Sequence, residues 1–228
     1  MKSVRLFLFV IISWSAFAAS PSDEADAAEV RETSTFSVPI LHDPPKYPSG
    51  ALRKHIEGWV VVRFSVLRDG TTADIEVVDA NIEKLFDKAA IRAASAWTYK
   101  PATRDGKPVT QYNKNARIIF AIKGMNNTVS QEFRSTYQKT ISAIKSDDMA
   151  AAESLINELD KNEQKLLAEV CYLDMVKARF FEKKGDKEAA NKHINRALVI
   201  ADDVVPVKVY SQLLKRSVVS NGLMSNYP

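Results

Sequence analysis

The clearest pattern in the chain is an alternation of positions between residues 59 and 67. Apolar residues recur there at every second position: Val60, Val62, Phe64 and Val66. Alternation with a period of two and many β-branched residues predicts a strand with one buried face. The dipeptide Asp69-Gly70 follows, and Asp-Gly between two such runs is typical of a hairpin turn. A second strand, with Ile75 and Val77 on its apolar face, is therefore expected to return beside the first.

The following stretch changes to a helical period. Apolar residues recur at helical spacing from Leu85 to Trp97, and Pro101 should end that element. Residues 105–108 are expected to form a loop, and residues 117–122 alternate as a last strand. With a short helix at Ser49–His55, the predicted order is helix, strand, strand, helix, strand. This is an α+β domain with a small antiparallel sheet.

Past Gly124 the strand patterns stop and helical patterns take over. Helices are expected at about residues 130–145, 149–158, 163–183, 187–200 and 207–219. Acidic residues stand at the breaks: Asp147-Asp148, Gly185-Asp186 and Asp202-Asp203. Because Asp at a helix N-cap accepts hydrogen bonds from free N–H groups, we interpret them as caps rather than catalytic pairs. The patterns predict a mixed domain over residues 44–124 and an all-α region of helical hairpins over residues 125–228.

The N-terminus has the pattern of a secretory signal peptide over residues 1–18. Lys2 and Arg5 form a positive region, an apolar run follows, and Ala16-Phe17-Ala18 is a cleavage signal. We therefore expect cleavage after Ala18. The alternative is an uncleaved membrane anchor, although the uncharged stretch of about 17 residues is short for a bilayer span.

Residues 19–43 have a different composition from the rest of the chain. They hold six acidic residues against one basic residue, Arg31, and Ser, Thr and Ala fill most of the other positions. Such a composition predicts a flexible acidic leader. Pro44 and Pro45 then stiffen the chain before the first domain.

Composition excludes several classes of function. The 228 residues carry a net charge of +4, without the dense Lys/Arg run of a nucleic-acid-binding protein. The one cysteine, Cys171, lies in an apolar helical stretch, so it indicates core packing and excludes an intramolecular disulfide. The three histidines are scattered, and no zinc, phosphate-loop or nucleophile-elbow motif occurs. We therefore expect no metal, no cofactor and no enzymatic activity.

The segment Pro44–Ile122 resembles the C-terminal domain of TonB-family proteins. Its motifs follow the family order: Tyr47-Pro48, Glu57-Gly58, Val60-x-Val62-x-Phe64-x-Val66, Asp69-Gly70, Phe86-Asp87, Ala89-Ala90, Trp97-x-Tyr99-x-Pro101, Gly106-Lys107-Pro108-Val109 and Ile118-x-Phe120-x-Ile122. Each motif alone is weak, but their order and spacing over about 80 residues are specific. The resemblance implies a TonB-like αββαβ fold whose motif residues build structure rather than perform catalysis.

The resemblance also implies a binding site at the edge of the sheet. In the family, the unpaired side of the last strand captures a short segment of an outer-membrane receptor by strand addition. Here that edge would run from Asn113 to Ala121, with these partner-binding residues: Asn113, Lys114, Asn115, Arg117 and Ile119. The family segment before the Tyr-Pro dipeptide also touches the receptor, and here the corresponding residues are Pro44, Pro45, Lys46 and Tyr47. Its two prolines depart from the expected polar residues, and an ordinary polar edge protected by charge is the alternative interpretation.

These features together suggest a periplasmic protein that binds another protein, with strand-exchanged homodimers as an open alternative. One rival function is a membrane-anchored energy transducer, but the acidic leader differs from the family's Pro-rich spacer. Another rival is an envelope scaffold that binds through its helices. The helical region loosely resembles tetratricopeptide repeats, on the following residues: Ala178, Phe181, Gly185-Asp186, Ala190, Ile194, Ala197 and Leu198.

Overall fold

The computed structural model describes residues 33–122, 128–162 and 165–221, without the side chains of residues 218–221. The predicted signal peptide (1–18), the first part of the predicted leader (19–32) and most of the predicted hinge (125–128) lie outside the described residues. None of the described helices is both long and apolar enough to cross a membrane.

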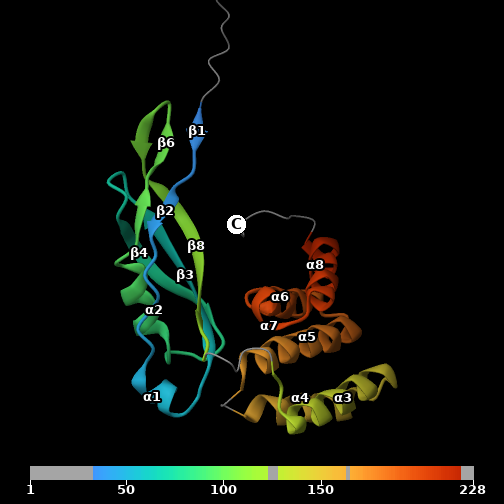
Figure 1. Cartoon of the computed structure of the whole chain (residues 1–228). Coiled ribbons are helices and arrows are strands. Elements are labelled where there is room, and N and C mark those ends of the chain that lie inside the picture. The colour runs from blue at the N-terminus through green and yellow to red at the C-terminus, as the bar shows by residue number, and fades with distance from the viewer. Residues whose placement is uncertain (1–32, 123–127, 163–164, 222–228) are drawn as a thin grey trace, which may run out of the picture. The chain divides into compact units, whose positions relative to one another are not determined.

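A three-stranded antiparallel sheet is the centre of the first domain (Figure 1). Its strands are β3 (Gly58–Val66), β4 (Thr72–Ala80) and β8 (Gln111–Phe120), in the order β4-β3-β8. The predicted hairpin between β3 and β4 is present. Asp69 accepts hydrogen bonds from the N–H (2.9 Å) and the hydroxyl (2.7 Å) of Thr71, and Gly70 takes φ +86°. A side chain at Gly70 would meet the Tyr99 carbonyl oxygen, 2.1 Å from an ideal Cβ.

One face of the sheet packs against α1 (Ser49–Arg53) and α2 (Asp87–Ala94). The largest side chains of this core are aromatic, and they include Phe64, Phe86, Trp97, Tyr99 and Phe120. The predicted helix over residues 85–97 is shorter in the structure. It ends at Ala94, and β5 (Thr98–Lys100) follows, where Tyr99 N–H donates to the Gly70 carbonyl at 2.8 Å.

Two small sheets extend the domain and correct the sequence prediction. β1 (Ser34–Thr35) pairs with β6 (Ala102–Arg104), which pairs with β7 (Lys107–Val109), and β2 (Val38–Leu41) pairs with β5. The prediction of a flexible leader over residues 19–43 was therefore wrong for part of residues 33–43, which forms strands. The predicted loop at 105–108 is a tight hairpin, because Asp105 and Gly106 both take the positive φ of such a turn.

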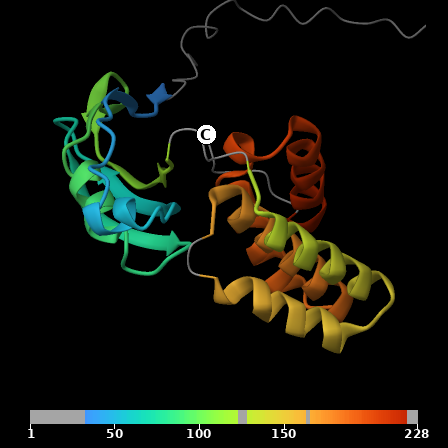
Figure 2. The same ribbon diagram turned by 60° about the horizontal axis from the view of Figure 1, so that its bottom comes forward.

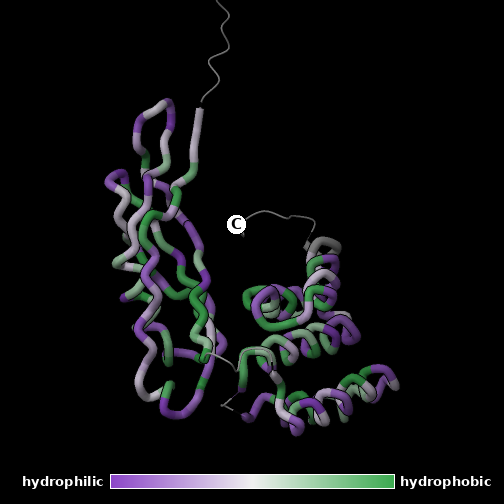
Figure 3. The backbone as a smooth tube through the Cα atoms, in the orientation of Figure 1, coloured by the Kyte–Doolittle hydropathy of each residue, from purple (hydrophilic) through white to green (hydrophobic). Residues whose placement is uncertain are grey.

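Six helices make up the described part of the C-terminal region: α3 (Gln131–Lys145), α4 (Met149–Lys161), α5 (Leu167–Lys184), α6 (Lys187–Leu198), α7 (Ala201–Val204) and α8 (Val207–Asn221). Asp148 and Asp186 cap α4 and α6, as predicted, by accepting backbone N–H groups at 3.0 and 2.9 Å. Figure 2 shows α3 and α4 side by side, and Figure 3 shows polar and apolar positions alternating around the helices. Cys171 is buried in α5, where burial raises the pKa of its thiol.

Asp202 and Asp203 do not have the role that the sequence suggested. They lie inside the short helix α7 rather than at a cap before the last helix. Their carboxylates instead pair with Arg117 of β8. The helical region thus uses these acids to contact the sheet.

The second face of the sheet is also buried, which the period of two did not predict. Trp59 and Val61, on the face opposite Val60 and Val62, are 0% and 2% exposed. They share one hydrophobic core with residues of α5–α8, against which Ile119 also packs. β3 is therefore buried on both faces, and the boundary predicted near residue 124 does not separate two independent cores.

Candidate functional site

β8 is an edge strand of the central sheet. Among the strands that the structure describes, it pairs with β3 on one side and with none on the other. Its register places Val60 opposite Ile118 and Val61 opposite Arg117. Because an unpaired strand edge offers rows of N–H and C=O groups, the far side of β8 is a template for another extended chain.

The pairing of β3 shows which groups of β8 face outward. The backbone groups of Trp59 point toward the β4 side. Its N–H donates to Asn81 Oδ1 (2.6 Å), and its C=O accepts from Asn81 N–H (3.3 Å). Successive residues of a strand point their N–H and C=O groups to opposite sides, so the next residue faces β8, opposite Ile118. Arg117 and Ile119 are one position away from Ile118. Their backbone groups therefore point away from β3, toward the open side.

The backbone just after β8 turns the same way. Ile122 lies four positions after Ile118, and its N–H donates to Glu57 Oε1 at 2.6 Å, at the start of β3. The other oxygen of Glu57 accepts from the N–H of Leu167, the first residue of α5, at 3.0 Å. Glu57 is fully buried, so its carboxylate joins the end of β8 to the start of a helix.

The Arg117 side chain makes its polar contacts within the chain. Its guanidinium donates to the Val199 carbonyl (2.6 Å) and to both oxygens of Asp202 (2.5 and 2.7 Å), and Asp203 lies at 3.4 Å. The hydrogen bond with Asp202 raises the pKa of Arg117 and lowers that of Asp202. Only the backbone of Arg117 therefore fits the binding role that the sequence suggested.

Three other predicted residues lie at the first part of β8. Asn113 is exposed and takes φ +56°, next to a register irregularity of the β3–β8 pair. Lys114 is half-buried, with its ammonium 5.5 Å from the centre of the Tyr99 ring, and burial lowers its pKa. Asn115 has a buried Oδ1 without a hydrogen-bond partner among the described residues. This end of the strand is thus partly tied to the domain core.

Of the predicted segment 44–47, Tyr47 lies at the opposite end of β8. Tyr47 is half-buried, and its hydroxyl donates to the Ile56 carbonyl at 2.7 Å and to the Phe120 carbonyl at 3.4 Å. Burial raises the pKa of Tyr47 to about 12. Pro44 and Lys46 are exposed, and Pro45 is half-buried. The structure therefore brings Tyr47 to Phe120, which lies seven residues, or about 23 Å at the usual rise per strand residue, along β8 from Asn113.

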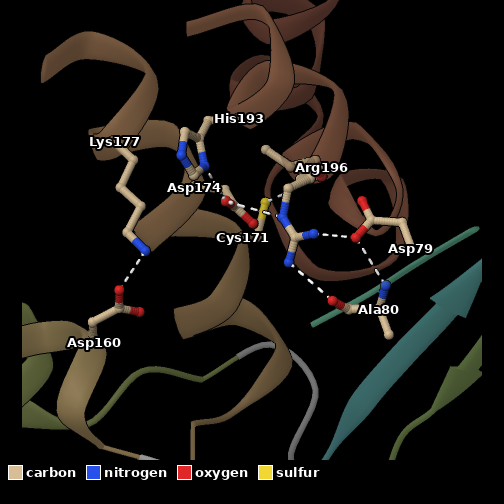
Figure 4. Close-up of polar contacts among 9 residues, drawn as sticks. Asp79, Ala80, Asp160, Cys171, Asp174, Lys177, His193 and Arg196 are labelled. Carbon is tan, nitrogen blue, oxygen red and sulfur yellow. Dashed lines mark hydrogen bonds and ion pairs between the residues drawn. The ribbon is translucent and has the colours of Figure 1, made fainter. Parts of the chain in front are cut away.

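Sequence reasoning missed the residues that fasten the helices to the sheet (Figure 4). Arg196 of α6 pairs with Asp79 of β4, donates to the Ala80 carbonyl at 3.1 Å and lies 4.9 Å from the Trp59 ring. Behind it, buried Asp174 contacts Arg196 at 3.7 Å and hydrogen-bonds His193 at 2.7 Å. No local pattern could reveal these contacts, because the paired residues are distant in sequence.

Several known proteins resemble the first domain. Residues 43–122 match the family model described as Gram-negative bacterial TonB protein C-terminal. Protein TonB of Pseudomonas aeruginosa is 36% identical over 73 residues, which cover 32% of this chain and 21% of that protein. Protein TonB of Escherichia coli is 33% identical over 94 residues, which cover 40% of this chain and 37% of that protein.

A solved structure gives a similar match. The solution structure of the Pseudomonas aeruginosa TonB CTD is 32% identical, with a TM-score of 0.34, and the match covers 38% of this chain and 87% of that one. The chain spans less than half the length of the two curated TonB proteins. The family match ends at residue 122, before the helical region. Residues 43–122 are thus a TonB-family C-terminal domain.

Proposed function

We propose that this protein acts in the periplasm by capturing an extended segment of an outer-membrane receptor on the open side of β8. The observation that carries the proposal is the edge itself: the backbone groups of Arg117 and Ile119 point away from β3, and no described strand covers them. Backbone hydrogen bonds to such an edge hold an extended peptide without requiring a catalytic group. The family of the domain supports a receptor as the partner.

The structure favours capture by backbone over capture by the charged side chains of the edge. Arg117 uses its guanidinium within the chain, and Lys114 lies over an aromatic ring. Affinity would then depend on the outward N–H groups, and a change at one of them should matter more than removal of a side chain.

Ile119→Pro tests this directly, because proline removes the outward N–H and is tolerated on edge strands. Ile119→Ala is the matched control, since it loses most of the side chain and keeps the N–H. A photo-cross-linking residue replaces Tyr112, which is 68% exposed on the same strand, and a second sample carries it at Val207 on α8, which is 79% exposed. Cross-linked peptides are mapped by mass spectrometry in cells that express each variant.

We expect the residue at position 112 to cross-link to an extended segment of an outer-membrane receptor, and the residue at 207 not to do so. The adduct should disappear with Ile119→Pro and persist with Ile119→Ala, while circular dichroism shows both variants folded. An adduct of equal yield in both variants would refute capture by the edge.

A further inference from the structure

The helical region presents two tyrosines side by side on one of its faces. Tyr137 of α3 and Tyr172 of α5 are in edge-to-face contact, with their ring centres 5.6 Å apart and their planes at 68°. Both rings pack against the hydrophobic core that α3, α4 and α5 share. Both side chains are only half-buried, and their hydroxyls make no hydrogen bond with other described residues. The two tyrosines thus form a small aromatic surface whose hydroxyls a partner can reach.

Two arginines stand at the ends of this tyrosine pair. Arg134 precedes Tyr137 by three residues on α3, so the two side chains lie on the same face of the helix, one turn apart. Arg179 follows Tyr172 by seven residues on α5, which is two turns along the same face. Because short connections make successive helices antiparallel, α3 and α5 run in the same direction. The two arginines therefore lie at opposite ends of the pair.

The charges of the arginines act on the tyrosine hydroxyls. Burial raises the pKa of Tyr137, and the charges of Arg179 and of Arg216 on α8 act in the opposite direction. Burial also raises the pKa of Tyr172, and the charge of Arg134 opposes it. Arg134 and Arg179 are exposed, and their side chains make no hydrogen bond or ion pair with other described residues. We use the name Arg–Tyr cluster for these four residues: Arg134, Tyr137, Tyr172 and Arg179.

The acidic residues of α3, α5 and α8 do not neutralise the Arg–Tyr cluster. α8 contains no acidic residue. On α5, Glu169 and Asp174 are buried and hydrogen-bonded within the chain, and Glu182 pairs with an arginine of α8. The acid of α3, Glu132, is two residues from Arg134 and therefore points to a different side of the helix. The cluster thus carries two positive charges without a counter-ion on these helices.

An acidic peptide has the chemistry and the length to match this arrangement. Guanidinium groups bind carboxylates through paired N–H···O bonds, and tyrosine offers apolar area together with a hydroxyl. The three residues from Arg134 to Tyr137 and the seven from Tyr172 to Arg179 rise about 15 Å in total along the helices. An extended chain covers about 13 Å in four residues, and the long arginine side chains span the difference. Two carboxylates four residues apart, with an aromatic residue between them, would meet both guanidiniums and the tyrosines.

We propose that the Arg–Tyr cluster is a second protein-binding surface of this chain and takes an extended acidic segment of a partner protein. The cluster lies on α3 and α5, after the residues that match the TonB family, so the proposal is independent of strand addition to β8. It gives the helical region a binding function of its own, beside that of the first domain.

The test uses the full chain and the fluorescently labelled peptide Gly-Glu-Ala-Phe-Ala-Glu-Gly, with a matched peptide that has Gln in place of both Glu residues. Fluorescence anisotropy at low salt measures the dissociation constants. We expect the Glu peptide to bind at least about fivefold more tightly than the Gln peptide, and this advantage to decline as salt screens the charges. Arg134→Gln and Arg179→Gln should each weaken binding of the Glu peptide about fivefold, as the loss of one exposed ion pair allows.

Lys139→Gln is the matched control. It removes one positive charge from an exposed position of α3, two residues from Tyr137 and therefore off the face of the cluster, so it should change the affinity less than about twofold. Circular dichroism checks that each variant is folded. Equal binding of the Glu and Gln peptides, or equal weakening by Lys139→Gln and the arginine variants, would overturn the proposal. Binding of phosphatidylglycerol vesicles through both arginines, without binding of the Glu peptide, would overturn it in favour of a lipid surface.

Discussion

Trp59 links the sheet to the helices through their shared core, so Trp59→Ala should destabilise both. Its indole is fully buried in the core that contains α5–α8. Removing a buried aromatic side chain lowers the free energy of unfolding by about 3–5 kcal/mol. The lost contact between the ring and the Arg196 guanidinium adds to this cost. The indole N–H has no hydrogen-bond partner among the described residues, so the substitution removes no hydrogen bond of that group. We expect a loss of about 4 kcal/mol.

This loss is large against the total stability of a typical domain. It should lower the urea midpoint by about 2 M, for a typical slope of about 2 kcal/mol per M. Circular dichroism at 222 nm follows the helices, and in Trp59→Ala the fluorescence of Trp97, which lies on the opposite face of the sheet, follows the first domain. Both transitions should shift together.

Val78→Ala is the control for this measurement. Val78 is an apolar residue of the same sheet, but it is 41% exposed, so its loss should cost less than about 0.5 kcal/mol. A helical transition that stays unchanged in Trp59→Ala, while the first domain is destabilised, would refute the shared core.

Three further variants test other parts of the fold. Gly70→Ala should lower the free energy of unfolding by more than about 2 kcal/mol, because its Cβ would clash with the Tyr99 carbonyl. Gly106 has a similar φ in open space, so Gly106→Ala should cost only about 1 kcal/mol. Equal losses in urea unfolding would contradict the clash. Glu57→Gln should cost about 2 kcal/mol in the same assay, because an amide cannot accept both backbone N–H groups, and a neutral result would show that the carboxylate is dispensable. Burial, and then the charge of a nearby lysine, lowers the pKa of His42 below 6.5, so the unfolded chain binds a proton first as the pH falls. The stability from neutral His42 is present above about pH 6.5 and declines below it, so His42→Gln should flatten the fall in urea midpoint between pH 7 and pH 5; a parallel fall would argue against this coupling.

The sequence predicted the parts of the fold that depend on local patterns. The alternation from Val60 to Val66 and the turn at Asp69-Gly70 predicted the β3–β4 hairpin, because strand period and turn chemistry are local properties. The open side of β8 followed from the family resemblance. The acid at 186 was also predicted correctly as a helix cap, since capping involves only its near neighbours.

The remaining features depend on contacts between distant residues. Trp59 and Arg196 are 137 positions apart, so no window of sequence shows that β3 is buried on both faces. The contact of Arg117 with Asp202 could not be predicted either, because the two residues are 85 positions apart. The strands within the leader were hidden by the acidic composition of the segment before them, although Phe36, Val38 and Ile40 alternate at a period of two.

The most direct test of strand addition is amide hydrogen exchange of the wild-type chain, measured by NMR with and without the receptor segment that cross-linking maps. The N–H groups of Arg117 and Ile119 point outward, and that of Ile118 points toward β3. The account predicts that bound peptide slows exchange at Arg117 and Ile119 and leaves Ile118 unchanged. Bound peptide without slower exchange at either outward N–H would contradict it.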